Sequence, residues 1–180
     1  MFLLQLGAQS FYQLYPLHLT RRSQLDGRWV GVISSVGVVV EIFFMLSFAR
    51  LVRAWTLRRV MYWGAIATGA RLVLLAVFPG AGVAVGVQLL HGMTVLALQV
   101  APPVFLNSRA RDRYRNSIQG LYTMGFAGAG RVAGALLAGW AAQRWGMGVT
   151  FGAAGLVCGV ATMLFYFTFH EGAESKDIKT

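Results

Sequence analysis

Long apolar stretches alternate with short arginine-rich connectors along this sequence, and this alternation restricts the fold more than any other feature. Between Leu72 and Ser108 the chain contains no Asp, Glu, Lys or Arg. Such a run is too long for one membrane crossing, which takes about 20 residues at a rise of about 1.5 Å each. The turn signal Pro79-Gly80-Ala81-Gly82 divides it into two crossings. The pattern therefore predicts an all-α membrane protein.

Six segments are long and apolar enough to be transmembrane helices. The predicted bundle covers residues 1–170, with spans at 1–20, 29–49, 60–78, 83–106, 117–142 and 147–169, and a polar cytoplasmic tail at 171–180. The composition agrees, because 57% of the residues are hydrophobic and 12% are charged, against about half and about a quarter in soluble domains. Residues 1–20 lack a basic start and a cleavage site, so they are predicted as a membrane helix and not as a signal peptide. The single cysteine excludes a disulfide framework.

The basic residues sort onto one side of the predicted bundle. A net charge of +10 in a soluble protein would point to nucleic acid. Here the arginines cluster in the connectors, so the positive-inside rule accounts for them and no nucleic-acid partner is expected. The opposite side carries only four, Arg21, Arg22, Arg28 and Arg144. The richer side carries ten, namely Arg50, Arg53, Arg58, Arg59, Arg109, Arg111, Arg113, Arg115, Lys176 and Lys179. We therefore expect both termini in the cytoplasm. The expected location of the chain is the inner membrane of a bacterial cell.

Four ionisable side chains fall inside predicted spans: Glu41, Arg71, His91 and Arg131. Helical rise places them about 12–22 Å from the cytoplasmic ends of their spans, in the middle of a hydrocarbon core about 30 Å thick. An ionised group there costs at least ~2.5–3.5 kcal/mol unless it is paired or hydrated. The sequence therefore predicts a shared polar cavity inside the bundle.

Uncharged polar residues recur at helical spacing in the same spans and support this cavity. In the first span they include Gln5, Gln9, Tyr12 and Gln13, and in the fourth Gln88 and Gln99 share a face with His91. The candidate substrate and proton pathway consists of Glu41, Arg71, His91, Gln88, Gln9, Tyr12, Gln13 and Arg131. No catalytic residue, metal site or cofactor is predicted.

A structural role remains an alternative for each of these residues. Glu41 and Arg71 could pair only to hold two helices together, and His91 could be a packing histidine. Arg131 lies in the glycine-rich segment GAGRVAG and could be structural as well. Polar side chains such as the glutamines of the first span also bond between helices in membranes.

Three segments resemble a known family. They are FARLVRAWTLRRVMYWG (48–64), QLLHGMTVLALQVAPP (88–103) and RNSIQGLYTMGFAGAGRVAGALLAGW (115–140). The first resembles the basic loop between helices eight and nine of major facilitator superfamily transporters, and the others resemble helices ten and eleven. The resemblance covers nearly the whole chain, as the C-terminal six-helix half of that fold, in the proton-coupled lactose permease and phenylpropionate permease branch.

The resemblance implies roles for three residues of this sequence. Glu41 corresponds to a carboxylate that contacts substrate, and Arg71 and His91 correspond to members of a proton-coupling cluster. Two departures stand out. The lactose permease pattern has a carboxylate one turn after the histidine, where this chain has Thr94 and Val95. The basic loop lacks the usual acidic residue and carries Trp55 where glycine is common.

The expected function is secondary active transport of a small polar or anionic solute, coupled to protons as symport, by alternating access. Such transporters bind solute between two six-helix halves. The expected partners are therefore the solute, the proton, the lipid bilayer, and a missing N-terminal half or a second copy. A fragment, a truncated product and a half-size protein are all consistent with the length. The alternatives are a non-transporting interaction or assembly subunit and an inactive truncated transporter. An enzyme is not expected, because no catalytic constellation is present.

Overall fold

The computed structural model describes residues 1–168, and this range is built of helices with no strand in it. Helix α1 (Phe2–Leu17) runs into the π-helical turn η1 (His18–Arg22), and α2 (Gly27–Ala54) and α3 (Leu57–Val77) follow. The segment predicted as the fourth crossing, and called the fourth crossing below, consists of α4 (Ala81–Gly86), η2 (Val87–Leu90), α5 (His91–Val95), η3 (Leu96–Val100) and α6 (Ala101–Arg109). The chain ends with η4 (Asp112–Tyr114), α7 (Arg115–Gly120), η5 (Leu121–Gly128) and α8 (Ala129–Thr168). The predicted tail, 171–180, lies outside the described residues.

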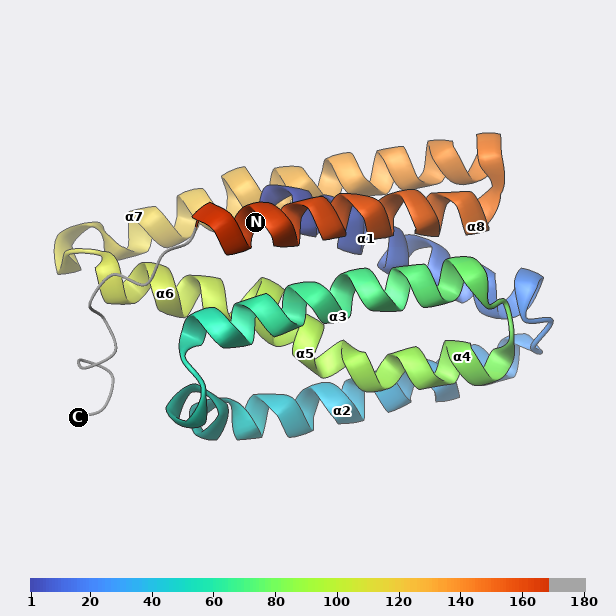
Figure 1. The fold of residues 1–180 in the computed structure, drawn as a ribbon, viewed down its shortest axis with the longest axis horizontal. Helices are drawn as coiled ribbons and strands as arrows, with labels where there is room; N and C mark the ends of the chain where they lie inside the picture. The colour runs from blue at the N-terminus through green and yellow to red at the C-terminus, as the bar shows by residue number, and fades with distance from the viewer. Residues whose placement is uncertain (169–180) are drawn as a thin grey trace.

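Four helices of the described part are long and apolar enough to cross a membrane: Gly27–Ala54, Leu57–Val77, Ala81–Arg109 and Met147–Thr168. The last of these is the second arm of α8, which bends back on itself at Gly146 (Figure 1). Gly146 has a φ of +83°, a conformation open to glycine and strained for other residues. The predicted all-α membrane class is confirmed. Helix α1 has 16 residues and is not among the four, so the full count of six crossings stays a prediction.

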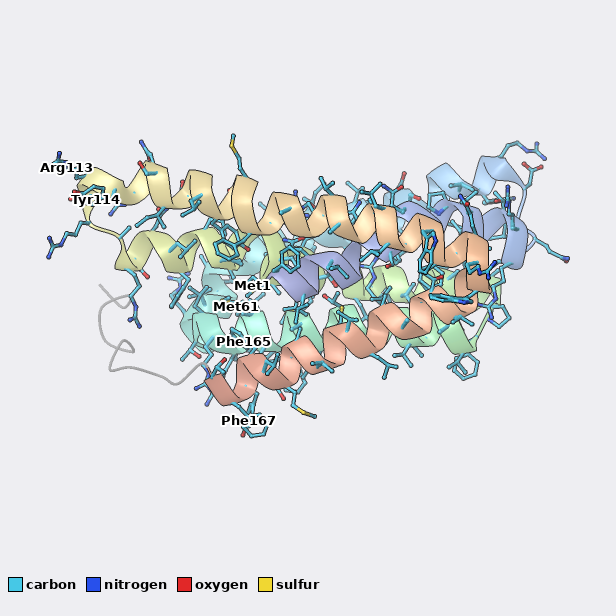
Figure 2. The ribbon with its side chains drawn as sticks, turned by 90° about the horizontal axis from the view of Figure 1, so that it is seen from above. Met1, Met61, Arg113, Tyr114, Phe165 and Phe167 are labelled. Carbon is cyan, nitrogen blue, oxygen red and sulfur yellow. The ribbon has the colours of Figure 1, made fainter. Side chains whose placement is uncertain are left out.

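The arginine-rich connectors lie at one end of the bundle. Figure 1 shows the α2–α3 and α6–α7 connections at the same end, with the α3–α4 turn and the bend of α8 at the other. Figure 2 places Arg113 and Tyr114 at the tip of that arginine-rich end. The arginine-rich connectors therefore share one end of the bundle, as the sequence predicts. Which side of the membrane each end faces stays a prediction.

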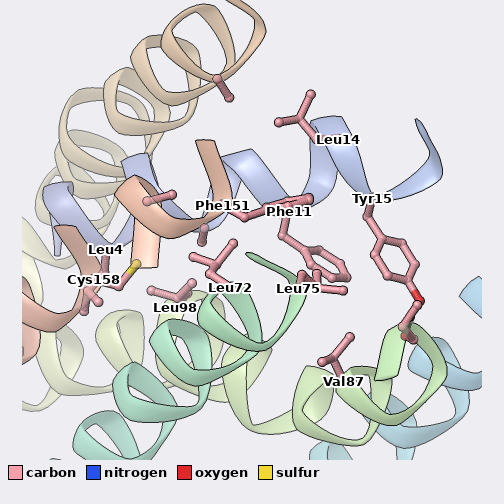
Figure 3. Packing of buried hydrophobic residues seen from close by; sticks show 14 of the residues in the cluster. Leu4, Phe11, Leu14, Tyr15, Leu72, Leu75, Val87, Leu98, Phe151 and Cys158 are labelled. Atoms are coloured by element: carbon pink, nitrogen blue, oxygen red, sulfur yellow. Dashed lines mark hydrogen bonds between the residues drawn. The ribbon is translucent and has the colours of Figure 1, made fainter. Parts of the chain in front are cut away.

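The core forms where α1, α3 and the second arm of α8 meet (Figure 3). Helix α1 contributes side chains three or four residues apart, which is the spacing of one helix face. These are Leu4, Ala8, Phe11, Leu14 and Tyr15. Helix α2 behaves differently, because only Ile33 and Gly37 are buried along it. Most of its contacts with the bundle are made to the fourth crossing, and most of its apolar surface is exposed.

Side chains cap the helix ends opposite the arginine-rich end. Arg22 donates to the carbonyl oxygens of Leu75 at 3.2 Å and Ala76 at 3.1 Å. These carbonyls belong to the last turn of α3, where no intrahelical donor is left and a cation is favoured by the helix dipole. Asp26 caps α2 by accepting the backbone N–H of Arg28 at 3.0 Å. The Arg28 guanidinium also holds the pKa of Asp26 below its usual range.

His18 is buried with both ring nitrogens unpaired within the described part of the chain. Its ring meets the edge of Phe151, with 5.6 Å between centroids. A buried polar group without a partner costs about 1–3 kcal/mol. We therefore expect His18→Leu to raise the melting temperature of the purified protein by roughly 2–12 °C. Phe151→Leu, the control, leaves the nitrogens unpaired and should lower it. A lower melting temperature for His18→Leu would contradict the unpaired state of the ring.

Candidate functional site

Three of the predicted charged or ionisable side chains meet in one chain of contacts inside the bundle. Arg71 Nη1 lies 3.1 Å from His91 Nδ1, and His91 Nε2 lies 3.4 Å from Glu41 Oε2. A guanidinium can only donate, so His91 Nδ1 must accept from Arg71. The ring proton then sits on Nε2 and faces the Glu41 carboxylate. His91 is thus a neutral bridge between a cation on α3 and an anion on α2.

Arg71 is sealed beneath an aromatic ring. It is 1% exposed, and its guanidinium carbon lies 3.2 Å from the ring centroid of Phe11, which is itself buried. A cation over an aromatic face is attracted by the ring, more strongly when water is excluded. The Nε and Nη2 atoms of Arg71 have no hydrogen-bond partner in the described residues. Arg71 is therefore a fixed positive charge that a solute cannot reach in this conformation.

The accessible part of the site consists of Tyr12, Glu41 and Gln99. Tyr12 is 39% exposed and presents its ring to His91 at 5.9 Å between centroids. Its side chain lies near that of Gln99, which is exposed. The Glu41 side chain is 27% exposed. A phenol, an amide and a carboxylate are hence within reach of a polar solute.

Gly37 brings α2 close enough for Glu41 to reach His91. A Cβ atom at position 37 would lie 2.6 Å from Gln88 Oε1 and 3.4 Å from His91 Cδ2. Glu41 follows one helical turn later on the same face. Gln88 is buried and lies near Tyr15, whose hydroxyl donates to the Ala84 carbonyl at 2.6 Å. Gln88 thus lines the packed side of the site.

The remaining predicted residues do not join this chain of contacts. Arg131 Nε donates instead to Gln5 Oε1 at 3.3 Å. Gln9 is half-buried and Gln13 is exposed. Gln99 is exposed, whereas Gln88 and His91 are buried. Gln99 lies next to Tyr12 and outside the chain of contacts.

Two participants have no signal in the sequence that would place them here. Phe11 is one of many apolar residues in its helix, and only the structure shows it over Arg71. Tyr122 lies in η5, and its hydroxyl donates to the Leu98 carbonyl oxygen over a distance of 3.5 Å. Gln5 is part of the predicted polar stripe, but its contact with Arg131 depends on how two helices pack.

A comparison with protein families identifies the wider group. The model described as the MFS_1 like family matches residues 1–153. The chain belongs to the MFS_1-like family. No solved structure matches it. Membership of this MFS_1-like family confirms the predicted superfamily and makes the chain a multi-pass protein of a transporter family. The lactose permease and phenylpropionate permease branch stays a prediction.

The site of this MFS_1-like protein has groups suited to binding and to moving a proton. The carboxylate and the imidazole can each take up and release a proton, and the buried guanidinium balances their charge. Within residues 1–168 no cluster of His, Cys, Asp or Glu could hold a metal ion. The side chains of the site can form hydrogen bonds and ion pairs and can exchange protons.

Proposed function

We propose that this chain is one half of a proton-coupled symporter for a small, uncharged polar solute. The observation that carries the proposal is the chain of contacts from a buried cation, through a neutral histidine, to a partly exposed carboxylate. Such a chain links the protonation of an accessible group to the packing of three crossings.

Proton binding at Glu41 is expected to loosen α2 from the fourth crossing. In the unprotonated state the carboxylate lies 3.4 Å from His91 Nε2, attracts the N–H there and balances Arg71. A proton on Glu41 removes that negative charge, so the contact with His91 loses its electrostatic attraction. The groups that face His91 are Glu41 from α2, Arg71 from α3 and the Tyr12 ring from α1. Proton binding therefore weakens one contact between α2 and the fourth crossing inside this bundle. We propose that the change reaches the surface that meets the partner bundle, where one bundle rocks against the other.

The exposed groups favour a neutral solute over an anion. A solute hydroxyl can donate to Glu41, and a ring or apolar face can lie on Tyr12. An anion that arrives before Glu41 is protonated would meet its carboxylate, while Arg71 is covered by Phe11. Like charges at short range are unfavourable, above all where water is scarce. These contacts support a solute with several hydrogen-bond donors and no negative charge.

The exposed polar residues support a second six-helix bundle as partner. Tyr12, Gln13 and Gln99 are open to the surroundings on the described part of the chain. Polar side chains near the middle of a membrane face protein or a water-filled cavity. A missing N-terminal half or a second copy would enclose them in such a cavity. The proposed location is the inner membrane, with both termini cytoplasmic.

Native membrane vesicles provide the test, because they retain any partner bundle. Vesicles from cells with and without the chain are given an inward proton gradient and a panel of labelled neutral and anionic solutes. We expect a neutral solute to accumulate only when the chain and the gradient are both present, and a protonophore to abolish this. If vesicles with and without the chain take up every solute equally, the result would contradict the proposal and favour a non-transporting subunit.

A further inference from the structure

The fourth crossing contains a break that its sequence makes unavoidable. In an α-helix the Leu98 carbonyl would accept from the N–H of residue 102, and in a π-helix from that of residue 103. Both are prolines, which have no N–H. The N–H of Ala101 is already used, because it donates to the Leu96 carbonyl across the π turn η3. The Leu98 carbonyl is therefore left without a donor in its own helix.

Gln5 supplies the missing donor from another helix. Its Nε2 donates to the Leu98 carbonyl at 3.0 Å, and the Tyr122 hydroxyl approaches the same oxygen at 3.5 Å. Gln5 is 4% exposed, so water does not compete for this bond. Figure 3 shows Leu98 within the core beside Leu4, the neighbour of Gln5 in α1. A buried carbonyl without a donor would cost free energy, and Gln5 removes that cost.

The other end of the same amide holds Arg131. Gln5 Oε1 accepts from Arg131 Nε at 3.3 Å. The two partners fix the orientation of the amide, because an arginine only donates and a carbonyl only accepts. The helices are also close here, since a Cβ atom at Gly130 would lie 3.1 Å from Gln5 Cβ. One side chain therefore ties α1 to the break and to α8.

We propose that Gln5 is a positioning residue that replaces the backbone donor withheld by Pro102 and Pro103 and fixes Arg131 to the same point. A helix bends most readily where its hydrogen-bond ladder is interrupted. His91 lies in the same crossing as this interruption, so a change of bend there moves His91 relative to α1 and α8. For transport, this role rests on the proposed function. As a statement about the fold, it stands without it.

A double-mutant cycle on stability tests the proposal without any transport assay. Pro102→Ala restores an N–H that can bond the Leu98 carbonyl within the helix. We expect Gln5→Leu to lower the melting temperature of the purified chain by roughly 2–4 °C. In the Pro102→Ala background we expect Gln5→Leu to lower the melting temperature by less than half as much. Gln9→Leu, one turn further along α1, is the matched control and should show no such dependence on residue 102. If Gln5→Leu lowers the melting temperature equally in the parent chain and in the Pro102→Ala chain, the proposal is overturned.

A second variant keeps the test decisive if Gln5→Leu does not fold. Gln5→Glu retains an acceptor for Arg131 but has no amide donor for the Leu98 carbonyl. We expect faster amide hydrogen exchange in residues 99–109 and unchanged exchange around residue 131. Unchanged exchange in 99–109 would contradict the role of the Nε2 donor.

The effect of Gln5 on transport is tested by measuring solute uptake in the same variants. We expect Gln5→Leu to lower the maximal rate of solute uptake with a KM within about twofold of the parent value. Pro102→Ala should partly restore the rate in the Gln5→Leu background. If the parent chain shows no uptake, the proposed function fails and the stability cycle still decides the role of Gln5. If uptake is present and the stability cycle is additive, only the positioning role fails.

Discussion

Glu41→Gln is expected to abolish proton-driven accumulation of solute and to leave the protein folded. The amide keeps the size of the side chain and an acceptor for His91 Nε2–H, which lies 3.4 Å from Glu41 Oε2 in the parent. It cannot take up a proton. Glu41 is the only Asp or Glu within the predicted spans, so no other carboxylate there can replace it. We expect accumulation under a proton gradient to fall at least about tenfold.

Counterflow separates proton coupling from solute binding. Vesicles loaded with unlabelled solute exchange it for labelled solute without a gradient, and this exchange needs no net movement of protons. We expect Glu41→Gln to keep counterflow within about threefold of the parent rate while accumulation is lost. Asp112→Asn is the matched control, because Asp112 pairs with Arg115 at 2.9 Å in a connector, away from the site. Full accumulation by Glu41→Gln would show that Glu41 does not carry the proton.

The membrane fold was predictable because it follows from composition along the chain. Uncharged runs of sufficient length, the turn at Pro79-Gly80 and the arginine-rich connectors are all local signals. The internal breaks were not predictable in the same way. The turns η2, η3 and η5 depart from 3.6 residues per turn, and the hydrophobic period of the sequence does not place them. The bend at Gly146 lies where the sequence predicts a connector.

The sequence predicts which residues belong to the site, but not which of them contact one another. Charged side chains in an apolar span identify Glu41 and Arg71, because burying an unpaired charge there is costly. Rise per residue gives their depth, but not the direction in which each helix faces. The sequence therefore left a direct Glu41–Arg71 pair open, whereas the structure places His91 between them. Arg131 was assigned to the pathway by the same depth argument, and the structure gives it Gln5 as its partner.

The second large effect is expected at Gly64, where α3 meets the fourth crossing. A Cβ atom at this position would collide with the Ala97 side chain and lie 2.5 Å from the Met93 carbonyl oxygen. The carbonyl belongs to the backbone of α5, so it can retreat only if α5 moves. Overpacking of this kind costs roughly 1–3 kcal/mol. Arg71 lies two turns after Gly64 in α3 and His91 lies two residues before Met93, so the displacement would separate Arg71 from His91 as well.

Gly64→Ala is therefore expected to lower both stability and transport. For a chain of this size the melting temperature should fall by roughly 2–12 °C, measured on the purified protein. Ala97→Gly in the same chain removes one of the colliding atoms and should recover part of the loss. Gly82→Ala is the control, because a Cβ atom there meets nothing within 4 Å. A parental melting temperature for Gly64→Ala would mean that α3 and α5 are further apart than the close contact at Gly64 requires. His91 would then have room to leave Arg71 without any proton binding, and the coupling through Glu41 would lose its structural basis.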